Sequence, residues 1–478
     1  MTSAFEGGRL KTTRRDVVKF ISSIEADERI AASTILVNQA HVITLARAGV
    51  IQKSAAQKLL GALRRIKPDN FSSHNIEDVH MYIEQNVTAR TGRKVGGLLH
   101  IGKSRNDQVA TAVRMSLRNE LLGLSESLLA FEKALLDLAK RHTSTVFPGY
   151  THLQPAQPIS FAHYLIANAE SLLRDSDRIL ETFGRVNKSP MGAGALAGTS
   201  FPLDRKLTAR LLGFDGLVET SLDAVGSRDF VLEALSVFAL ISSDLSRMAN
   251  DFIYYSSSGV GLVAIPDEFA STSSIMPQKK NPDPLELIRA KCGKVATNFN
   301  SAITIMHGLP SGYNLDYQEL TPLLWKSIDE LKACTQILTE MIPLLQVSRE
   351  IKDGNQFTAA TEVANILVRE ESVPFRSAHR IVGALVRDAI RTGKSLGGLT
   401  QTDLERQLGR PVRSSTLALI AKSMDLKQLL LSYRTSGSPN PQESRRLIRL
   451  SLQKWGDLRR DTLRRQHSIA DAVRALQR

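Results

Sequence analysis

Apolar side chains recur every seven residues along residues 230–255. One series is Val231, Phe238, Leu245 and Phe252, and a second series, offset by three residues, is Ala234, Ile241, Met248 and Tyr255. Two interleaved series of this kind occupy the a and d positions of a long helix that packs lengthwise against other helices. The pattern therefore predicts one helix of a bundle in this segment.

Four further segments in the middle of the chain have helical periodicity. In residues 107–141, Leu121, Leu128 and Leu135 alternate with Leu124, Phe131 and Leu138. The other three segments are residues 160–186, 282–307 and 317–345, each bounded by Pro or Gly. The five long helices predict a central bundle. Because apolar stripes of this length often meet helices of other subunits, we also expect an oligomer.

Shorter helices are expected on both sides of the bundle. Residues 40–48 and 55–65 are amphipathic, and the later part of the chain is interrupted at residues 393–398 and 436–441. We therefore expect an all-α fold in which two smaller helical domains flank the bundle. The expected divisions are an N-terminal domain (1–105), a central helix-bundle domain (106–350) and a C-terminal domain (351–478).

The composition agrees with this fold class. Aromatic residues make up only 5% of the chain, whereas aliphatic residues are abundant, which favours helices over an aromatic-rich β-sandwich. Cys292 and Cys334 are too few for a disulfide framework, so we expect a reducing compartment, the cytoplasm. Residues 1–20 lack the apolar core of a signal peptide, and no later window has the apolar length of a membrane span.

The formal net charge is +14, and part of this excess lies in residues 441–478. Arg445, Arg446, Arg449, Lys454, Arg459, Arg460, Arg464 and Arg465 are the basic residues that stand out there. A solvated helical face is favoured over a nucleic-acid patch because no nucleic-acid motif accompanies them. A positive field could also attract a polyanionic substrate.

Four polar segments between the helices carry groups that bind acids or move protons. They are residues 102–108, 149–154, 272–282 and 312–318. The third segment combines hydroxyls, an amide, Lys279 and Lys280 directly before a helix that Pro282 could begin. Since a helix N-terminus offers free N–H groups and a positive dipole end, this segment is typical of a mobile anion-binding loop.

Residues 273–282, Ser-Ser-Ile-Met-Pro-Gln-Lys-Lys-Asn-Pro, resemble the signature loop of the fumarase/aspartase superfamily. The Gln-Lys-Lys core is similar to that of argininosuccinate lyases rather than fumarases, aspartases or adenylosuccinate lyases. The blocks at residues 104–108, 149–154, 195–200, 221–230 and 313–318 resemble the same family in the same order. The resemblance spans residues 20–383 and implies a fumarase/aspartase-like fold.

The resemblance implies a role for each of five catalytic residues. Ser273 is the general base that removes a proton next to a carboxylate, and His152 is the general acid toward the leaving guanidinium nitrogen. Glu286 pairs with a histidine, while Lys279 and Asn281 stabilise the aci-carboxylate intermediate. An isolated hydroxyl is too weak a base, so Lys279, loop N–H groups and the helix start must assist it.

Seven substrate-binding residues are also implied by the resemblance. They are Ser23, Arg105, Asn106, Thr151, Arg228, Tyr313 and Gln318. Argininosuccinate carries three carboxylates, which Arg, amide and hydroxyl groups can bind in defined directions. The chain departs from the family pattern at Leu315, where relatives have Arg, and at Thr321, where they have Lys. It also departs in residues 5–9, where many members have Trp before the glycines.

Other interpretations compete at single positions. His152 could be structural and Ser273 could be a helix N-cap, but their motifs favour catalysis. His80 could equally support the site or cap a helix. The glycines of residues 192–198 have the wrong spacing for a dinucleotide loop. We expect no metal and no cofactor, since no ligand spacing is present.

The sequence therefore predicts an argininosuccinate lyase, a carbon-nitrogen lyase of arginine biosynthesis that forms arginine and fumarate from argininosuccinate. The resemblance also implies a homotetramer in which each active site draws segments from three subunits. One alternative is a lyase of another fumarate adduct. A second is a non-catalytic protein of the same fold, either crystallin-like or binding nucleic acid through its basic C-terminus, although we regard a nucleic-acid partner as unfavoured. No membrane partner is expected.

Overall fold

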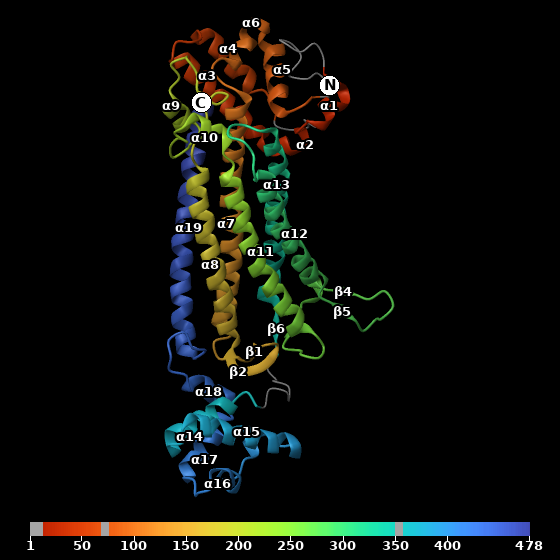
Figure 1. The fold of residues 1–478 in the computed structure, drawn as a ribbon, viewed down its shortest axis with the longest axis vertical. Helices are drawn as coiled ribbons and strands as arrows, with labels where there is room; N and C mark the ends of the chain where they lie inside the picture. Colours follow the sequence, from red (N-terminus) through yellow and green to blue (C-terminus); the bar gives the residue numbers. More distant parts are fainter. Residues whose placement is uncertain (1–12, 68–75, 349–356) are drawn as a thin grey trace.

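The computed structural model describes residues 13–67, 76–348 and 357–478. Five long helices run side by side along the molecule (Figure 1). They are α7 (Arg105–Arg141), α8 (Phe161–Val186), α11 (Asp229–Ser256), α12 (Asp283–Met306) and α13 (Leu320–Met341). The short helices η5 (Leu315–Glu319) and η6 (Ile342–Leu344) flank α13. The predicted all-α fold with a central long-helix bundle is confirmed. Residues 5–9, where the sequence departs from the family pattern, lie outside the described residues.

The heptad pattern explains how the bundle packs. In α11 both apolar series are buried, and Val231, Phe238 and Leu245 are fully excluded from solvent. The apolar positions of α7 and α8 are buried in the same core, so one continuous core follows the length of the bundle. Burying each such side chain contributes about 1.5–3 kcal/mol, which is why the long helices are stable only together.

A sixth long helix, α19 (Pro441–Gln477), also belongs to this bundle. It packs along α7 and α8 and brings Ile448, Leu458 and Ile469 into the core. The Trp455 indole donates a hydrogen bond of 2.7 Å to the Leu129 carbonyl. Residues 441–478 belong to the expected C-terminal domain, but their helix returns beside the central helices (Figure 1).

Most of the basic residues of α19 lie on its solvent-facing side. Arg446, Arg460, Arg464 and Arg474 each form an ion pair with an acidic residue three positions earlier. Neighbouring charges at this spacing stabilise an exposed helix by a few tenths of a kcal/mol per pair. The arrangement agrees with the expected solvated face.

Small helices cover one end of the bundle, where the C-terminus also lies (Figure 1). They are α1 (Arg15–Phe20), α2 (Ile24–Asp27), η1 (Glu28–Ile30), α3 (Ala31–Arg47), α4 (Lys53–Leu63), α5 (Val79–Thr91), α6 (Arg93–Gly96), η3 (Gly97–His100), α9 (Arg205–Leu211) and α10 (Ser221–Gly226). α3 joins this cap to the bundle because it packs against α7. The cap surrounds the first turn of α7.

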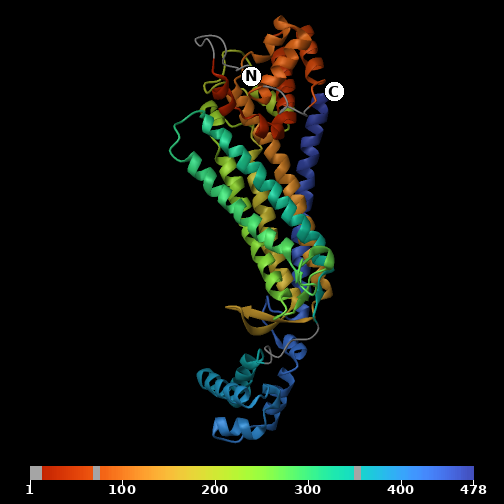
Figure 2. The same cartoon turned by 90° about the vertical axis from the view of Figure 1, so that its right-hand side faces the viewer.

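The opposite end carries a separate group of helices with its own apolar core (Figure 2). They are α14 (Ala360–Glu371), α15 (Phe375–Thr392), η8 (Leu396–Gly398), α16 (Gln401–Leu408), α17 (Ser414–Ser423) and α18 (Leu426–Ser432). Between this group and the bundle lies the antiparallel hairpin of β1 (Val146–Thr151) and β2 (Gln154–Ser160), which follows α7 in the chain.

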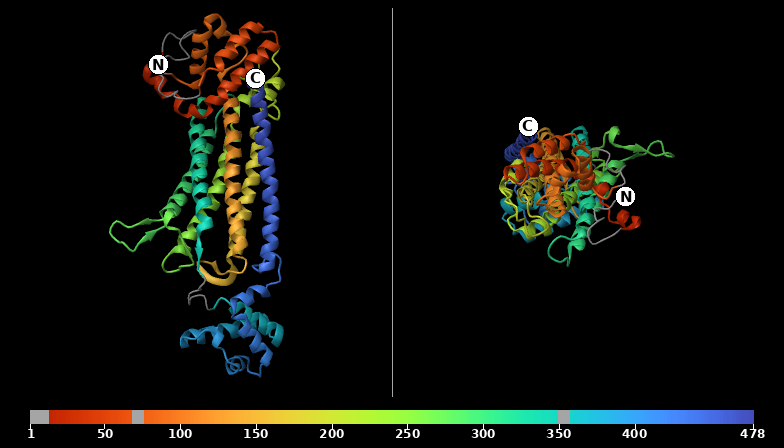
Figure 3. Two further views of the ribbon diagram at one scale, coloured as in Figure 1. Left: turned by 180° about the vertical axis from the view of Figure 1, so that it is seen from behind. Right: turned by 90° about the horizontal axis from the view of Figure 1, so that it is seen from above.

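Two further strand pairs are short. β3 (Val263–Ala264) pairs with β6 (Gln346–Val347), and β4 (Ser271–Thr272) pairs with β5 (Lys280–Asn281). The β4–β5 hairpin projects sideways from the bundle just before α12 (Figure 3). Within the described part of the chain, every helix is too short or too polar to cross a bilayer.

Candidate active site

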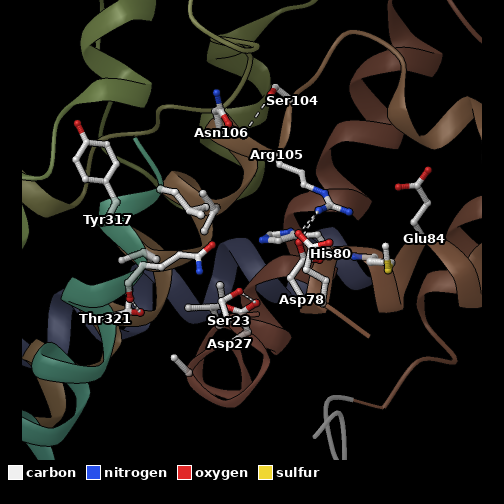
Figure 4. Close-up of a pocket in the computed structure, with 18 of the residues that line it drawn as sticks. Ser23, Asp27, Asp78, His80, Glu84, Ser104, Arg105, Asn106, Tyr317 and Thr321 are labelled. Carbon is white, nitrogen blue, oxygen red and sulfur yellow. Dashed lines mark hydrogen bonds and ion pairs between the residues drawn. The ribbon is translucent and has the colours of Figure 1, made fainter. Parts of the chain in front are cut away.

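A cavity of about 870 Å³ lies at the capped end of the bundle (Figure 4). Six of the seven predicted substrate-binding residues line it. They are Ser23, Arg105, Asn106, Arg228, Tyr313 and Gln318. These residues come from α2, the first turn of α7, the start of α11 and the segment around η5. The fold therefore brings together positions that lie about 300 residues apart in the sequence.

The first turn of α7 is held by a capping box. The Ser104 side chain accepts a hydrogen bond from the helix, and Asp107 accepts one of 3.0 Å from the Ser104 N–H. Such reciprocal bonds satisfy N–H groups that a helix start leaves open. Arg105 and Asn106 follow Ser104 directly, so the cap fixes where their side chains begin.

The glycine-rich segment of residues 192–198 supports the same turn. The Gly192 and Gly194 N–H groups donate to the Asp107 carboxylate at 3.0 and 2.9 Å. Gly194 has φ +61°, and a Cβ there would lie 2.6 Å from the Gly198 carbonyl oxygen. Only glycine fits this close approach. The segment therefore has a structural role beside α7.

Arg105 is oriented by two acidic residues of the cavity. Its guanidinium donates a hydrogen bond of 2.6 Å to Asp78 and lies 3.8 Å from Glu77. Asp78 is also the N-cap of α5 and accepts the Met81 N–H at 2.7 Å. Because the carboxylate is fixed by the helix start, it fixes the guanidinium in turn.

Ser23 contacts a second buried acid. Its hydroxyl donates to Asp27 at 2.8 Å, and the Val79 N–H donates to the same carboxyl oxygen at 3.2 Å. Burial, together with the negative charge of Asp78, raises the pKa of Asp27 to about 7. The Asp27 carboxyl therefore changes its charge near neutral pH.

His80 is buried in the wall of the same cavity. Burial lowers the pKa of His80 to about 4, so its ring is neutral at physiological pH. Neither ring nitrogen has a hydrogen-bond partner among the described residues. A neutral imidazole offers one acceptor and one donor, and both are buried here.

Arg228 has a different environment from Arg105. It is 3% exposed and donates hydrogen bonds to the Val225 and Ser227 carbonyls at 3.2 and 2.7 Å. Its guanidinium lies over the Tyr317 ring, 4.7 Å from the centroid. Burial lowers the pKa of Arg228. Within this chain, Arg228 thus holds the turn before α11 against η5.

Thr151 and His152 lie at the other end of α7, on the tip of the β1–β2 hairpin. Thr151 pairs with Gln154, so His152 and Leu153 form a two-residue turn. Both turn residues have positive φ, 54° and 57°, which costs a non-glycine residue about 1 kcal/mol or more. The turn presents an exposed His152 beside an exposed Leu153.

Ser273, Lys279 and Asn281 lie on the projecting β4–β5 hairpin, and Glu286 lies in the first turn of α12. The Ser273 hydroxyl oxygen accepts the Ile275 and Met276 N–H groups at 3.3 and 3.1 Å. The turn that follows Ser273 is exposed. The expected contact of Glu286 with a histidine is absent among the residues described in this chain.

The two lysines of this hairpin differ in their contacts. Lys280 binds the Ile265 carbonyl and the Asp267 carboxylate, so it fastens the hairpin to the preceding segment. The Lys279 ammonium is exposed and has no ion-pair partner in the described residues. Lys279 is thus the cation that the hairpin can offer to a ligand.

The predicted residues form three separate clusters in one chain. We define the cavity cluster as Ser23, Arg105, Asn106, Arg228, Tyr313 and Gln318, the turn cluster as Thr151 and His152, and the hairpin cluster as Ser273, Lys279, Asn281 and Glu286. α7 has 37 residues, so the cavity and turn clusters lie about 55 Å apart. The hairpin projects away from both (Figures 1 and 3). One chain alone does not assemble the predicted site.

Comparison with known proteins places the chain in a family. A lyase model matches residues 9–297, and an argininosuccinate lyase C-terminal model matches residues 357–429. Argininosuccinate lyase from Methanosarcina acetivorans is 40% identical over 455 residues, covering 94% of this chain and 92% of the relative. The chain belongs to the argininosuccinate lyase family. A relative of that name from Methanothermobacter thermautotrophicus is 41% identical over 460 residues, covering 94% and 97%.

Solved structures of the wider superfamily share the fold of this family member. An EDDS lyase in complex with formate matches with a TM-score of 0.88 and 28% identity, covering 100% of this chain and 97% of that one. A class II fumarase from Schistosoma mansoni matches with a TM-score of 0.72 and 18% identity, covering 84% and 91%. The fumarase/aspartase-like fold expected from the sequence is therefore confirmed.

Both departures from the family pattern, Leu315 and Thr321, line the cavity. Four acidic residues of the cavity, Asp27, Glu77, Asp78 and Glu84, are not among the residues expected from the sequence. The adjacent pair of Glu77 and Asp78 before a helix could have indicated these acidic residues in the sequence, because Asp is a favoured N-cap.

Among the described residues, no three His, Cys, Asp or Glu side chains gather as metal ligands.

Proposed function

We propose that the protein cleaves argininosuccinate to L-arginine and fumarate, a step of arginine biosynthesis. The proposal rests chiefly on the identity of about 40% to argininosuccinate lyases over 94% of the chain. In the reaction, a base removes the proton from the carbon next to a carboxylate. The C–N bond then breaks, its electron pair goes to the guanidino nitrogen, and an acid protonates that nitrogen.

In this proposal the hairpin cluster supplies the base and the stabilising charges. Ser273 removes the proton, and the two N–H donors at its oxygen help that oxygen to carry negative charge. Lys279 and Asn281 stabilise the aci-carboxylate that forms next. Lys279 suits this role because its ammonium is not engaged by an acidic residue of the described chain.

His152 supplies the proton to the leaving nitrogen, and Thr151 binds substrate beside it. The strained turn places His152 at an exposed tip, where it can enter another site. Glu286 orients a histidine, and we assign that contact to a neighbouring subunit. The cavity cluster binds the substrate through Ser23, Arg105, Asn106, Arg228, Tyr313 and Gln318.

We further propose a homotetramer in which each active site combines the three clusters from three subunits. The distance between the clusters in one chain supports this arrangement. Exposed apolar side chains on the bundle support it as well, since Leu287 and Ile303 of α12 are 59% and 46% exposed. Exposed apolar side chains on a long bundle helix are compatible with contacts to other subunits.

Two further expectations remain proposals. We place the enzyme in the cytoplasm, in agreement with the unpaired, buried Cys292 and Cys334. We also retain domain boundaries near residues 105 and 350. The separate apolar core of α14–α17 supports the second boundary, whereas α19 returns to the bundle.

The direct test is release of fumarate from argininosuccinate by the purified protein, followed by ultraviolet absorbance. Adenylosuccinate, aspartate and malate are assayed beside it under the same conditions. We expect turnover of argininosuccinate at least about a hundredfold faster than that of the other compounds. Turnover of another fumarate adduct alone would support the alternative lyase, and inactivity toward all four would contradict the proposed function.

A further inference from the structure

The turn of the β1–β2 hairpin is strained and has little support from its own residues. His152 and Leu153 both have positive φ, a conformation that suits Asn or Gly better than these two residues. Both side chains are exposed, so neither anchors the turn by burial. A contact from outside the turn must therefore fix its shape.

The strands behind the turn add little support. Pro155 pairs with Tyr150, and a proline has no N–H to donate across a strand pair. The register also shifts between Pro148 and Tyr150. The pair of Thr151 and Gln154 alone separates this irregular stretch from the turn.

The last turn of α11 supplies a contact to the hairpin tip. The Tyr254 hydroxyl donates a hydrogen bond of 3.4 Å to the Leu153 carbonyl. The Tyr254 ring also meets the Tyr150 ring edge-on, with 5.4 Å between the centroids and 88° between the planes. One side chain thus contacts both the turn and the strand that leads into it.

Tyr254 is itself held by a rigid element. Its neighbours Phe252 and Tyr255 belong to the bundle core and are 0% and 7% exposed. The Tyr255 ring packs edge-on against Phe147 of β1, with 5.1 Å between the centroids. The end of α11 and the base of the hairpin therefore form one aromatic cluster, and a side chain on such a support can fix a loop.

We propose that Tyr254 is a positioning residue for His152. Through the Leu153 carbonyl and the Tyr150 ring, it sets the direction in which the turn presents the imidazole to a neighbouring subunit. The inference rests on the proposed function, in which His152 protonates the leaving nitrogen. A displacement of about 1 Å in a reacting group can lower a rate about a hundredfold, so this support affects kcat strongly.

Steady-state kinetics of fumarate release tests the two contacts separately. Tyr254→Phe removes the hydroxyl and should lower kcat by about two- to tenfold, the effect of one hydrogen bond. Tyr254→Ala also removes the ring and should lower kcat by about a hundredfold. Tyr255→Phe is the matched control and should leave kcat unchanged, because the turn is bound by the hydroxyl of Tyr254 and not by that of its neighbour.

Hybrid oligomers show whether the defect lies in the turn cluster. When Tyr254→Ala is mixed with Ser273→Ala, some sites receive an intact turn from one chain and an intact hairpin from the other. Fumarate release should then rise to about a quarter of the wild-type value. Tyr254→Ala mixed with His152→Asn should show no rise above Tyr254→Ala alone, since neither chain has an intact turn. A general loss of folding stability would not produce this difference.

Two further comparisons keep the test decisive. The mixture of Ser273→Ala with His152→Asn is the positive control for subunit exchange. If Tyr254→Ala does not assemble, Tyr254→Phe replaces it in both mixtures, where the same order of activities is expected.

The outcomes separate this inference from the proposed function. Equal kcat values for Tyr254→Phe and Tyr255→Phe would overturn the inference, as would recovery in the mixture with His152→Asn. Failure to recover with Ser273→Ala, while the positive control recovers, would overturn it as well. In each of these cases the wild-type activity on argininosuccinate stands. If the wild-type protein releases no fumarate, the proposed function itself fails.

Discussion

Adjacent residues of the β4–β5 hairpin have different tasks. Lys280 is bound to Asp267 and to the Ile265 carbonyl, whereas Lys279 has no acidic partner in the described chain. Ser273 lies on the same hairpin, and its oxygen accepts two N–H groups. The base and the free cation of the proposed reaction thus lie on one short segment.

Replacing each lysine by methionine tests this division of labour. Lys279→Met should lower kcat by about a hundredfold or more, because it removes a charge that stabilises the intermediate. Lys280→Met should have a smaller effect, since it loosens the hairpin but leaves the reacting charge. Steady-state kinetics on argininosuccinate measures both. Equal losses, or a larger loss for Lys280→Met, would contradict the assignment.

The sequence could identify site residues only where a motif carried them. Ser273, His152 and Arg105 stand in motifs that resemble those of the family. Asp27 and Glu84 were missed because their environment depends on tertiary packing: Asp27 lies in a four-residue helix, and its carboxyl accepts the N–H of Val79, 52 positions further along the chain. Periodicity predicts that a residue faces inward, but it does not predict what lies opposite.

At the scale of elements, the sequence predicted the long helices of the bundle. It did not predict which helices α19 packs against. The apolar repeats of α7 and α11 specify helices whatever packs against them. The repeat in α19 is equally compatible with packing on α14–α18 or on α7 and α8. The choice depends on contacts such as Trp455 to the Leu129 carbonyl, which join residues more than 300 positions apart.

The interface between α7 and α8 buries two carboxyl groups. The Ser176 hydroxyl donates to Glu132 at 2.7 Å, and Arg178 donates to Asp175 at 2.7 Å. Burial raises the pKa of Glu132 to about 8 and that of Asp175 to about 7. The folded state therefore binds these protons more tightly than the unfolded state does.

This burial predicts how stability depends on pH. The contribution of Glu132 is fully present below its unfolded pKa of 4.5 and is lost as pH rises through about 8. Glu132→Gln should therefore reduce the fall in the thermal unfolding midpoint between about pH 4 and about pH 9, a range that brackets both pKa values. Thermal denaturation followed by circular dichroism measures it. An equal fall in both proteins would show that Glu132 does not titrate as described.

At the scale of the whole molecule, the site is divided along the long axis. The cavity cluster and the turn cluster lie at opposite ends of α7, and the hairpin cluster projects to the side (Figure 1). Chemistry that needs all three clusters within hydrogen-bond reach requires several chains. The sequence of one chain does not reveal contacts between subunits. Only the resemblance to the family suggested a site shared between chains.

Hybrid oligomers test this arrangement most directly. Ser273 is half-buried and His152 is exposed, so Ser273→Ala and His152→Asn should both fold, and the proposed roles predict that both are inactive. The two variants are mixed in equal amounts, dissociated and reassembled. Some sites then receive an intact His152 from a Ser273→Ala chain and an intact Ser273 from a His152→Asn chain. Random assembly should restore about a quarter of the wild-type fumarate release.

Mixing Ser273→Ala with Lys279→Met, which belong to one hairpin, should restore none. No recovery in the first mixture after verified subunit exchange, or a fully active wild-type monomer, would contradict a site shared between chains.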